Sequence, residues 1–314
     1  MGKKGLDDYL IIDCHSHLYT NREIGRRASE FVNMRDFAGG HDGTVHDALA
    51  SMEKDNVSKM IMMNYTPTAY MKDAALERLP FNSSDYQKAE KEIDIFLNER
   101  VKRRNLWTCQ VAKEHPELIP FISVDASMSS DEIKKEIMDK VNNHGAKGIK
   151  FQHQANRWIA HDRRLWPAYE VLQELDLPVM CHSGLAEGFP YPRALTEPKF
   201  FADILSDFPK LRLVLAHLGI GYWDQTRKLA KRYKNVYFDC NAVYKPFPGE
   251  HTLENGDFIN LVREIGTDRI VFGSEYPMMA IYRPAVLQHI IDIDLTEEEK
   301  RMILGENAIR IYKL

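Results

Sequence analysis

Eight short apolar segments recur along the chain, and they constrain its fold more than any other feature. Most are nearly continuous in apolar residues, as in parallel strands that are buried on both faces. The eight segments are Tyr9–Asp13, Lys59–Asn64, Ile119–Val124, Gly148–Phe151, Pro178–Cys181, Arg212–Ala216, Val236–Asp239 and Ile270–Gly273. Because longer amphipathic stretches separate them, the pattern predicts repeated strand–helix units.

The stretches between these segments have the spacing of helices. Ile133, Ile137 and Val141 lie four residues apart with charged residues between them, which predicts one apolar helix face. Thr44 followed by Asp47 resembles a capping box at the start of another helix. The last stretch, Leu295–Leu314, is predicted to be a helical tail that could cover one face of the fold.

This order of elements favours one domain over residues 1–314, since no linker rich in Pro, Gly or Ser divides the chain. The predicted fold belongs to the α/β class and is a (β/α)8 TIM barrel with a helical C-terminal tail. An open, doubly wound sheet is the alternative, which periodicity does not exclude. Against it, no G-x-G-x-x-G sequence follows any of the predicted strands.

Charge and cysteine content narrow the class of protein. Lys and Arg number 42 against 46 Asp and Glu, so the formal net charge of −4 provides no basic field for nucleic acid. The four cysteines lie far apart, which favours a reducing compartment. No apolar run is long enough for a membrane span or a secretion signal. We therefore expect a cytoplasmic protein with no nucleic-acid or membrane partner.

Histidines at the predicted strand ends indicate metal chemistry. His15 and His17 lie two residues apart, so their side chains point to the same side of the first strand. His182 and His217 end the fifth and sixth strands, and Glu275 follows the eighth. Each histidine alone could be a strand-end residue bonded to backbone. Together they suit Zn²⁺ and related ions, because barrel closure gathers the strand ends at one mouth.

The motifs around these residues resemble the amidohydrolase superfamily, in particular the amidohydrolase-2 branch that contains aminocarboxymuconate-semialdehyde decarboxylase-like enzymes. The resemblance covers nearly the whole chain, and the motifs are specific to the superfamily rather than to a substrate. They are Asp13-Cys14-His15-Ser16-His17, Gly145–Lys150, Leu177–Gly184, Leu215–Gly219, Phe272–Pro277 and Gly305–Ala308. The resemblance implies one divalent metal, typically zinc with manganese or another transition ion as alternatives.

By motif position, the resemblance implies that His15, His17 and His182 are metal ligands. His217 matches the histidine that usually contacts the metal-bound water or the substrate, and so is a predicted catalytic residue. The family normally has Asp where this chain has Glu275. The extra methylene leaves two roles open for Glu275, a metal ligand or a catalytic base acting through water. Some hydratase-type relatives use Glu here, which weakens the default assignment as a hydrolase.

Further polar residues near the mouth are candidate substrate contacts. Lys150 ends the fourth strand, where binuclear relatives carry a carbamylated bridging lysine; a lysine paired with a carboxylate is the alternative. Arg157 and Arg193 lie in predicted mouth loops and could clamp a substrate carboxylate. Cys14 and Cys181 alternate out of phase with the predicted ligands, so we expect both to pack against the helices.

The predicted function is hydrolysis of an amide, ester or lactone bond in a small carboxylated molecule. A metal-activated water would be the nucleophile, Glu275 its base, and His217 the group that stabilises the developing oxyanion. The alternative is a metal-dependent lyase, either a non-oxidative decarboxylase or a hydratase. A third reading is a barrel without catalysis that serves as a binding protein. The resemblance is also consistent with a homodimer.

Overall fold

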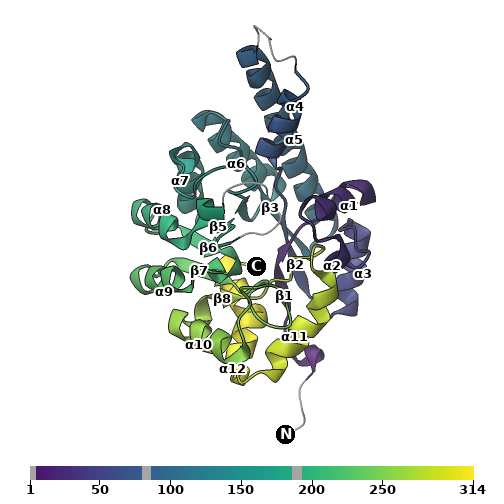
Figure 1. Ribbon diagram of the computed structural model, residues 1–314, viewed down its shortest axis with the longest axis vertical. Coiled ribbons are helices and arrows are strands. Elements are labelled where there is room, and N and C mark those ends of the chain that lie inside the picture. The colour runs from purple at the N-terminus through teal and green to yellow at the C-terminus, as the bar shows by residue number, and fades with distance from the viewer. Residues whose placement is uncertain (1–4, 80–85, 186–192) are drawn as a thin grey trace.

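The computed structural model describes residues 5–79, 86–185 and 193–314. In these residues eight strands form one parallel sheet, in which each strand pairs with the next along the chain. Helices surround the sheet (Figure 1). The strands are β1 (Ile12–Ser16), β2 (Lys59–Met63), β3 (Leu118–Ile122), β4 (Gly148–Phe151), β5 (Pro178–Cys181), β6 (Arg212–Leu215), β7 (Val236–Asp239) and β8 (Ile270–Val271).

The sheet closes on itself through the segment that follows β8. The Cys14 amide donates to the Phe272 carbonyl at 2.9 Å, and the His17 amide donates to the Tyr276 carbonyl at 2.7 Å. These bonds join the last strand to the first, as an open sheet could not. The predicted (β/α)8 barrel is therefore confirmed.

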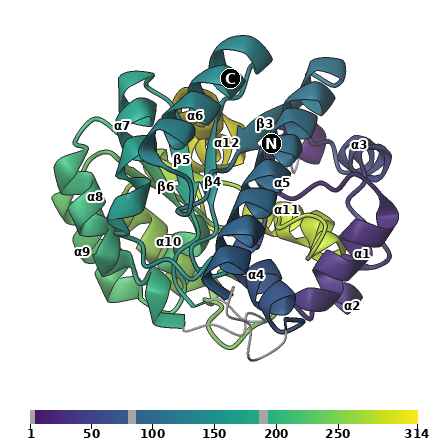
Figure 2. The same cartoon turned by 90° about the horizontal axis from the view of Figure 1, so that it is seen from above.

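The helices follow the predicted alternation with the strands, and α4 and α5 lie side by side as a hairpin (Figure 2). Thr44 caps α3 by accepting a hydrogen bond from the Asp47 amide at 3.3 Å. The predicted capping box is only half formed, because the Asp47 carboxylate accepts from the amides of Asp42 and Gly43 instead of that of Thr44. None of the described helices is long and apolar enough to cross a membrane. The helices are α1 (Arg22–Phe31), α2 (Arg35–Ala38), α3 (Val45–Lys54), α4 (Thr68–Leu76), α5 (Tyr86–Glu114), α6 (Ser130–His144), α7 (Trp166–Glu174), α8 (Ala202–Asp207), α9 (Trp223–Arg232), α10 (Asn255–Ile265), α11 (Arg283–Asp292), α12 (Glu297–Arg301) and α13 (Asn307–Tyr312).

The first strand lies three residues later than predicted and contains an irregularity. Asp13 pairs with Met60 but Ser16 pairs with Met62, so β1 has one extra residue over this stretch. A bulge of this kind changes which side chains face inward. Cys14 consequently packs in the inner cluster of strand residues. The expectation that Cys14 faces the helices is wrong.

Cys181 belongs instead to the cluster between strands and helices, where it neighbours Tyr169 of α7, as expected. The predicted tail is also confirmed. Its residues Ala308, Ile311 and Tyr312 pack against the inner faces of the strands and close the end of the barrel opposite the site described below. The C-terminus accordingly lies near the barrel axis (Figure 1).

A buried arginine ties the start of α11 to β1 and α3. The side chain of Arg283 is fully buried. It donates to the Asp55 carboxylate at 2.8 Å and lies 3.5 Å from the Asp13 carboxylate. Asp13 in turn accepts the amide hydrogens of His15 and Ser274, at 3.2 and 3.0 Å. This network fixes the two backbone segments that carry the first and last residues of the candidate site.

Replacing Arg283 by Met should destabilise the fold strongly. The variant would leave two buried carboxylates without their cation, a change that typically costs about 3–5 kcal/mol of unfolding free energy. Urea unfolding followed by circular dichroism measures this loss. Arg301→Met is the control, because its exposed ion pair with Glu306 should contribute less than about 1 kcal/mol. Equal stabilities for the two variants would contradict the assigned role of Arg283.

Candidate metal centre at the barrel mouth

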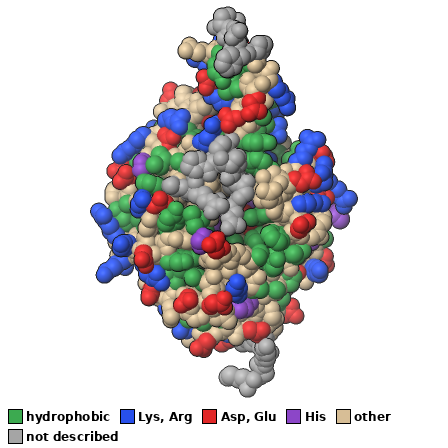
Figure 3. Space-filling model, in the orientation of Figure 1, with side chains coloured by type: hydrophobic (Ala, Val, Ile, Leu, Met, Phe, Trp, Pro, Cys, Tyr) green, Lys and Arg blue, Asp and Glu red, His purple; other side chains and the backbone are tan. Residues whose placement is uncertain are grey.

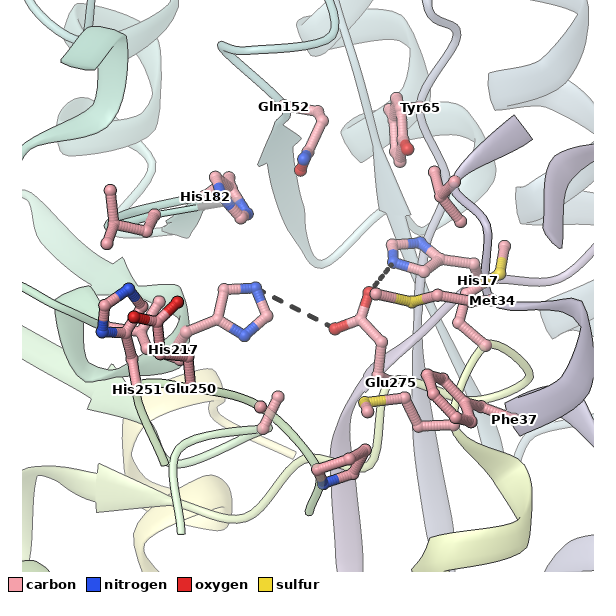
Figure 4. Close-up of a pocket in the computed structure, with 18 residues that line it drawn as sticks. His17, Met34, Phe37, Tyr65, Gln152, His182, His217, Glu250, His251 and Glu275 are labelled. Atoms are coloured by element: carbon pink, nitrogen blue, oxygen red, sulfur yellow. Dashed lines mark hydrogen bonds and ion pairs between the residues drawn. The ribbon is translucent and has the colours of Figure 1, made fainter. Parts of the chain in front are cut away.

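A pocket of about 250 Å³ opens at the carboxyl ends of the strands and gathers most of the predicted site. Four of the predicted residues line it: His17, His182, His217 and Glu275 (Figure 4). Other polar residues on its wall are Tyr65, Gln152, Glu250 and His251, which the sequence analysis did not single out. The rest of the wall is mainly apolar and includes Val32, Met34, Phe37, Leu185, Ile220, Met278 and Met279.

Three imidazoles of the site are each held through the Nδ1 atom. The partners are the Asp239 carboxylate for His15 at 2.7 Å, the Met63 carbonyl for His17 at 2.7 Å and the Asn241 carbonyl for His217 at 3.2 Å. An acceptor at Nδ1 keeps the proton there and leaves the lone pair on Nε2. Each Nε2 atom is thereby presented as a potential metal ligand.

The Glu275 carboxylate lies among these Nε2 atoms. Oε1 is 3.3 Å from Nε2 of His17, and Oε2 is 3.4 Å from Nε2 of His15. Oε2 also lies 3.9 Å from Nε2 of His217 (Figure 4). Donor atoms of His15, His217 and Glu275 all lie within 4.8 Å of one another. Such separations fit nitrogen and oxygen ligands placed about 2 Å from one shared ion.

His182 lies across the pocket from Glu275, beside His217 (Figure 4). Its Nε2 atom is buried and has no hydrogen-bond partner in the described part of the protein. Its ring lies 4.9 Å from that of His217, measured between centroids. An unpartnered buried nitrogen is costly unless a ligand completes its bonding. The residues present therefore fit a divalent metal ion with mixed imidazole and carboxylate ligands.

The electrostatics of the site favour the ligand forms of these groups. Burial, together with the Lys150 ammonium, lowers the pKa of His15 to about 4. Burial also holds the pKa of His182 well below its usual range. For Glu275, burial alone would raise the pKa, but the imidazoles of His15, His217 and His17 outweigh burial and hold the pKa well below its usual range. At neutral pH, His15 and His182 are therefore neutral and Glu275 is an anion.

Two site residues have a backbone conformation that is uncommon for residues other than glycine. The φ angle is 58° at His217 and 59° at Glu275. This left-handed region costs about 1–3 kcal/mol for such residues and occurs preferentially at functional sites. The backbone that leads to Glu275 is closely packed against β1. A Cβ atom added at Gly273 would lie 2.7 Å from Cβ of His15.

Asp239 and Asn241 organise the site, and the sequence analysis gave neither of them a role. Asp239 binds His15 through Oδ2, while its Oδ1 accepts the amide hydrogens of His217 and Asn241 at 2.9 and 3.0 Å. The Asn241 side-chain amide donates to Oε2 of Glu275. Burial alone would raise the pKa of Asp239, but the His15 imidazole outweighs it and lowers that pKa. The sequence offered one signal for Asp239: an aspartate ends this apolar strand, between two strands that carry site residues.

Of the predicted substrate contacts, Lys150 and Arg157 do not line this pocket. Lys150 is fully buried, with Nζ 3.3 Å from Nε2 of His15, and it does not line the pocket. Arg157 lies at a second, polar cavity, where it donates to Asp73 at 2.5 Å. The short 3-10 helix Arg193–Thr196 begins at Arg193, but the side chain of Arg193 lies outside the described residues.

Two curated relatives share part of the sequence. A 2-keto-4-carboxy-3-hexenedioate hydratase from Sphingobium sp. is 28% identical over 183 residues, which is 48% of this chain and 50% of that protein. A gamma-resorcylate decarboxylase from Polaromonas sp. is 25% identical over 182 residues, 48% of this chain and 54% of that protein. The matched regions thus span about half the length of these relatives.

A solved structure and a family model extend the similarity to the whole chain. The structure is 5-carboxyvanillate decarboxylase from Novosphingobium aromaticivorans, in complex with manganese and 4-hydroxy-3-methoxy-5-nitrobenzoic acid. It superimposes with a TM-score of 0.65 at 16% identity, covering 99% of this chain and 98% of that one, and so shows a shared fold. The family model described as Amidohydrolase matches residues 12–314. The chain belongs to the amidohydrolase family, in the branch that the predicted resemblance named.

Proposed function

We propose that this protein is a metal-dependent lyase that removes CO₂ from a small aromatic carboxylic acid. The observation that carries the proposal is the combination of a metal-type donor set with an apolar pocket wall. No Lys or Arg side chain lines the pocket within the described residues. A substrate with several carboxylates would therefore lack counter-charges there, whereas one carboxylate beside the donor set would not.

We assign His15, His17, His182 and Glu275 to a divalent metal ion, either manganese or zinc. Bound there, the ion supplies positive charge that holds substrate oxygens and stabilises the charge that develops when a carbon–carbon bond breaks. The hydrogen bonds at Nδ1 of His15 and His17 keep each Nε2 atom available. Asn241 holds the Glu275 carboxylate from the other side.

His217 is assigned to the substrate rather than to the ion. Its Nε2 atom faces the pocket, and its Nδ1 atom is held by the Asn241 carbonyl. When the bond to the carboxylate carbon breaks, CO₂ leaves and the electron pair stays on the ring carbon. A proton taken from solvent and delivered by His217 then forms the new carbon–hydrogen bond. Its position within the donor group makes a ligand role for His217 the alternative.

Hydration is the second candidate, supported by the sequence similarity to a hydratase. An ionised Glu275 could accept a proton from the attacking water. Against it, that relative's substrate is named as a carboxylated hexenedioate, and the described pocket wall offers no cation for a multiply charged acid. Hydrolysis, the leading interpretation of the sequence, has weaker support than the lyase alternative because the named relatives are lyases.

The reaction type can be tested with protein loaded with Mn²⁺ or Zn²⁺ and incubated with 2,6-dihydroxybenzoate, 5-carboxyvanillate and a panel of lactones and unsaturated keto acids. Decarboxylation should release CO₂ in step with substrate loss. In D₂O the product should carry one deuterium at the vacated carbon. Addition of one water across the double bond of an unsaturated keto acid would favour hydration, and opening of a lactone ring to its hydroxy acid would favour hydrolysis.

His217→Asn should lower kcat by about 10²–10⁴-fold while the bound metal is retained, because it removes the proposed proton donor but no ligand. Glu275→Gln should lower both the activity and the metal content, since a neutral amide is a poorer ligand. Steady-state kinetics and elemental analysis give the two readouts. His144→Asn, at the end of α6, is the control and should change neither. Loss of metal from His217→Asn would reassign His217 as a ligand.

Asp239→Asn should weaken metal binding by about 10–100-fold, because it removes the charged acceptor that holds the His15 ring. Chelator competition measures the affinity, and the visible spectrum of the Co²⁺-loaded protein reports the ligand arrangement. Asp125→Asn is a matched control, since Asp125 is also buried but bonds Thr68 and Ser127 instead. Equal affinities and spectra in the two variants would rule out the positioning role.

A further inference from the structure

We propose that the side-chain amide of Gln152, together with the Tyr65 hydroxyl, recognises a hydroxyl group on the ring of the substrate. The inference rests on the proposed function, because it takes the substrate to be an aromatic acid whose carboxylate lies beside the metal donors. Gln152 directly follows β4, and Tyr65 lies just after β2. Both line the pocket, and the mechanism above gives neither of them a role.

The Gln152 side chain is buried without a partner. Only 5% of its surface is exposed. Its backbone carbonyl accepts from the Asn156 amide at 3.3 Å, but its side-chain amide forms no hydrogen bond within residues 5–79, 86–185 and 193–314. The polar end of the side chain points into the pocket (Figure 4). A buried amide is costly unless a partner completes its bonding, and at this position a ligand in the pocket can do so.

The Tyr65 hydroxyl is a second group of the same kind. The Tyr65 ring packs edge-on against the His17 ring, with centroids 5.6 Å apart and an interplanar angle of 82°. This contact holds the ring, while the hydroxyl forms no hydrogen bond to any described residue. Figure 4 shows Tyr65 and Gln152 on the same side of the pocket, across from Glu275. One wall of the pocket therefore carries two neutral groups that are free to bond a ligand.

The order of the strands explains why this wall is separate from the donors. The assigned donors and His217 come from β1, β5 and β6 and from the segment after β8. Asp239 on β7 lies between them, so this part of the mouth is continuous around the barrel. Tyr65 and Gln152 follow β2 and β4, which belong to the remaining part. An aromatic acid with its carboxylate at the donors would therefore turn another edge of its ring to these two residues.

The chemistry of an amide selects the substituent on that edge. An amide has both N–H donors and a carbonyl acceptor, so it can bond a hydroxyl in either direction. A methoxy group only accepts, and a ring hydrogen does neither, so each leaves part of the amide unpaired. A second carboxylate would lack a counter-charge, since no Lys or Arg among the described residues lines the pocket. Figure 3 accordingly shows most Lys and Arg side chains towards the outline of the molecule.

Calorimetric titration of the Mn²⁺-loaded protein tests the assignment. The probes are benzoate, the 2-, 3- and 4-hydroxybenzoates and the matching methoxybenzoates. At least one hydroxybenzoate should bind about tenfold or more tightly than its methoxy counterpart and benzoate. Gln152→Met keeps the length of the side chain but removes its hydrogen bonds, so this preference should fall below about threefold while the Kd of benzoate changes little. Gln110→Met, at an exposed position of α5, is the control and should keep the wild-type preference.

Tyr65→Phe gives an independent test of the same wall. It keeps the ring against His17 and removes only the hydroxyl, so the preference should fall by about threefold or more. Thermal unfolding and metal content should match those of the wild type in both variants, because neither side chain bonds a metal donor. A wild type without any preference, or a preference that persists in both variants, would overturn the recognition role.

Release of CO₂ separates this inference from the proposed function. A preference that Gln152→Met abolishes, with no CO₂ released from any aromatic acid, would support recognition by Gln152 and contradict decarboxylation. CO₂ release by the wild type, with a preference for hydroxylated acids that Gln152→Met and Tyr65→Phe leave unchanged, would overturn the recognition role alone.

Discussion

The buried Asp239 carboxylate is the interaction on which the arrangement of the site depends most. It ends β7, and its two oxygens reach the His15 ring, the His217 backbone and the Asn241 backbone. Asn241 then bonds the Glu275 side chain. One short segment thus links residues that come from the first, sixth and eighth strands. Because each link is a directional hydrogen bond in a dry interior, the site is held in place before any ligand binds.

Burial and backbone strain shape what these groups can do. Desolvation lowers the pKa of His15 and of His182, and the Asn241 side-chain amide donates a hydrogen bond to the Glu275 carboxylate. The left-handed backbone at His217 and Glu275 aims both side chains into the pocket at a cost that the barrel and its closure offset. The polar centre is set beneath an apolar wall. In such surroundings the field of a bound cation is screened less than in water, which suits the loss of a neutral gas from an anion.

The projecting α4–α5 hairpin is an addition to the basic strand–helix pattern of the barrel. Its helices sit between β2 and β3, where a (β/α)8 unit needs only one helix. The extra length places apolar side chains beyond the core, where the barrel cannot bury them.

The sequence by itself determined the barrel and the strand-end residues that gather at its mouth. Apolar runs report burial on both faces of parallel strands, and residues at strand ends must meet at one mouth when those strands close, so His15, His17, His182 and Glu275 could be named in advance. Tertiary structure alone decided the rest. The bulge in β1 turned Cys14 inward, and Asp239 became the link between strands. Arg157 was directed to a second cavity. Periodicity records which side of a strand a residue occupies, but bulges, hydrogen-bond partners and loop directions depend on contacts between segments far apart in the chain.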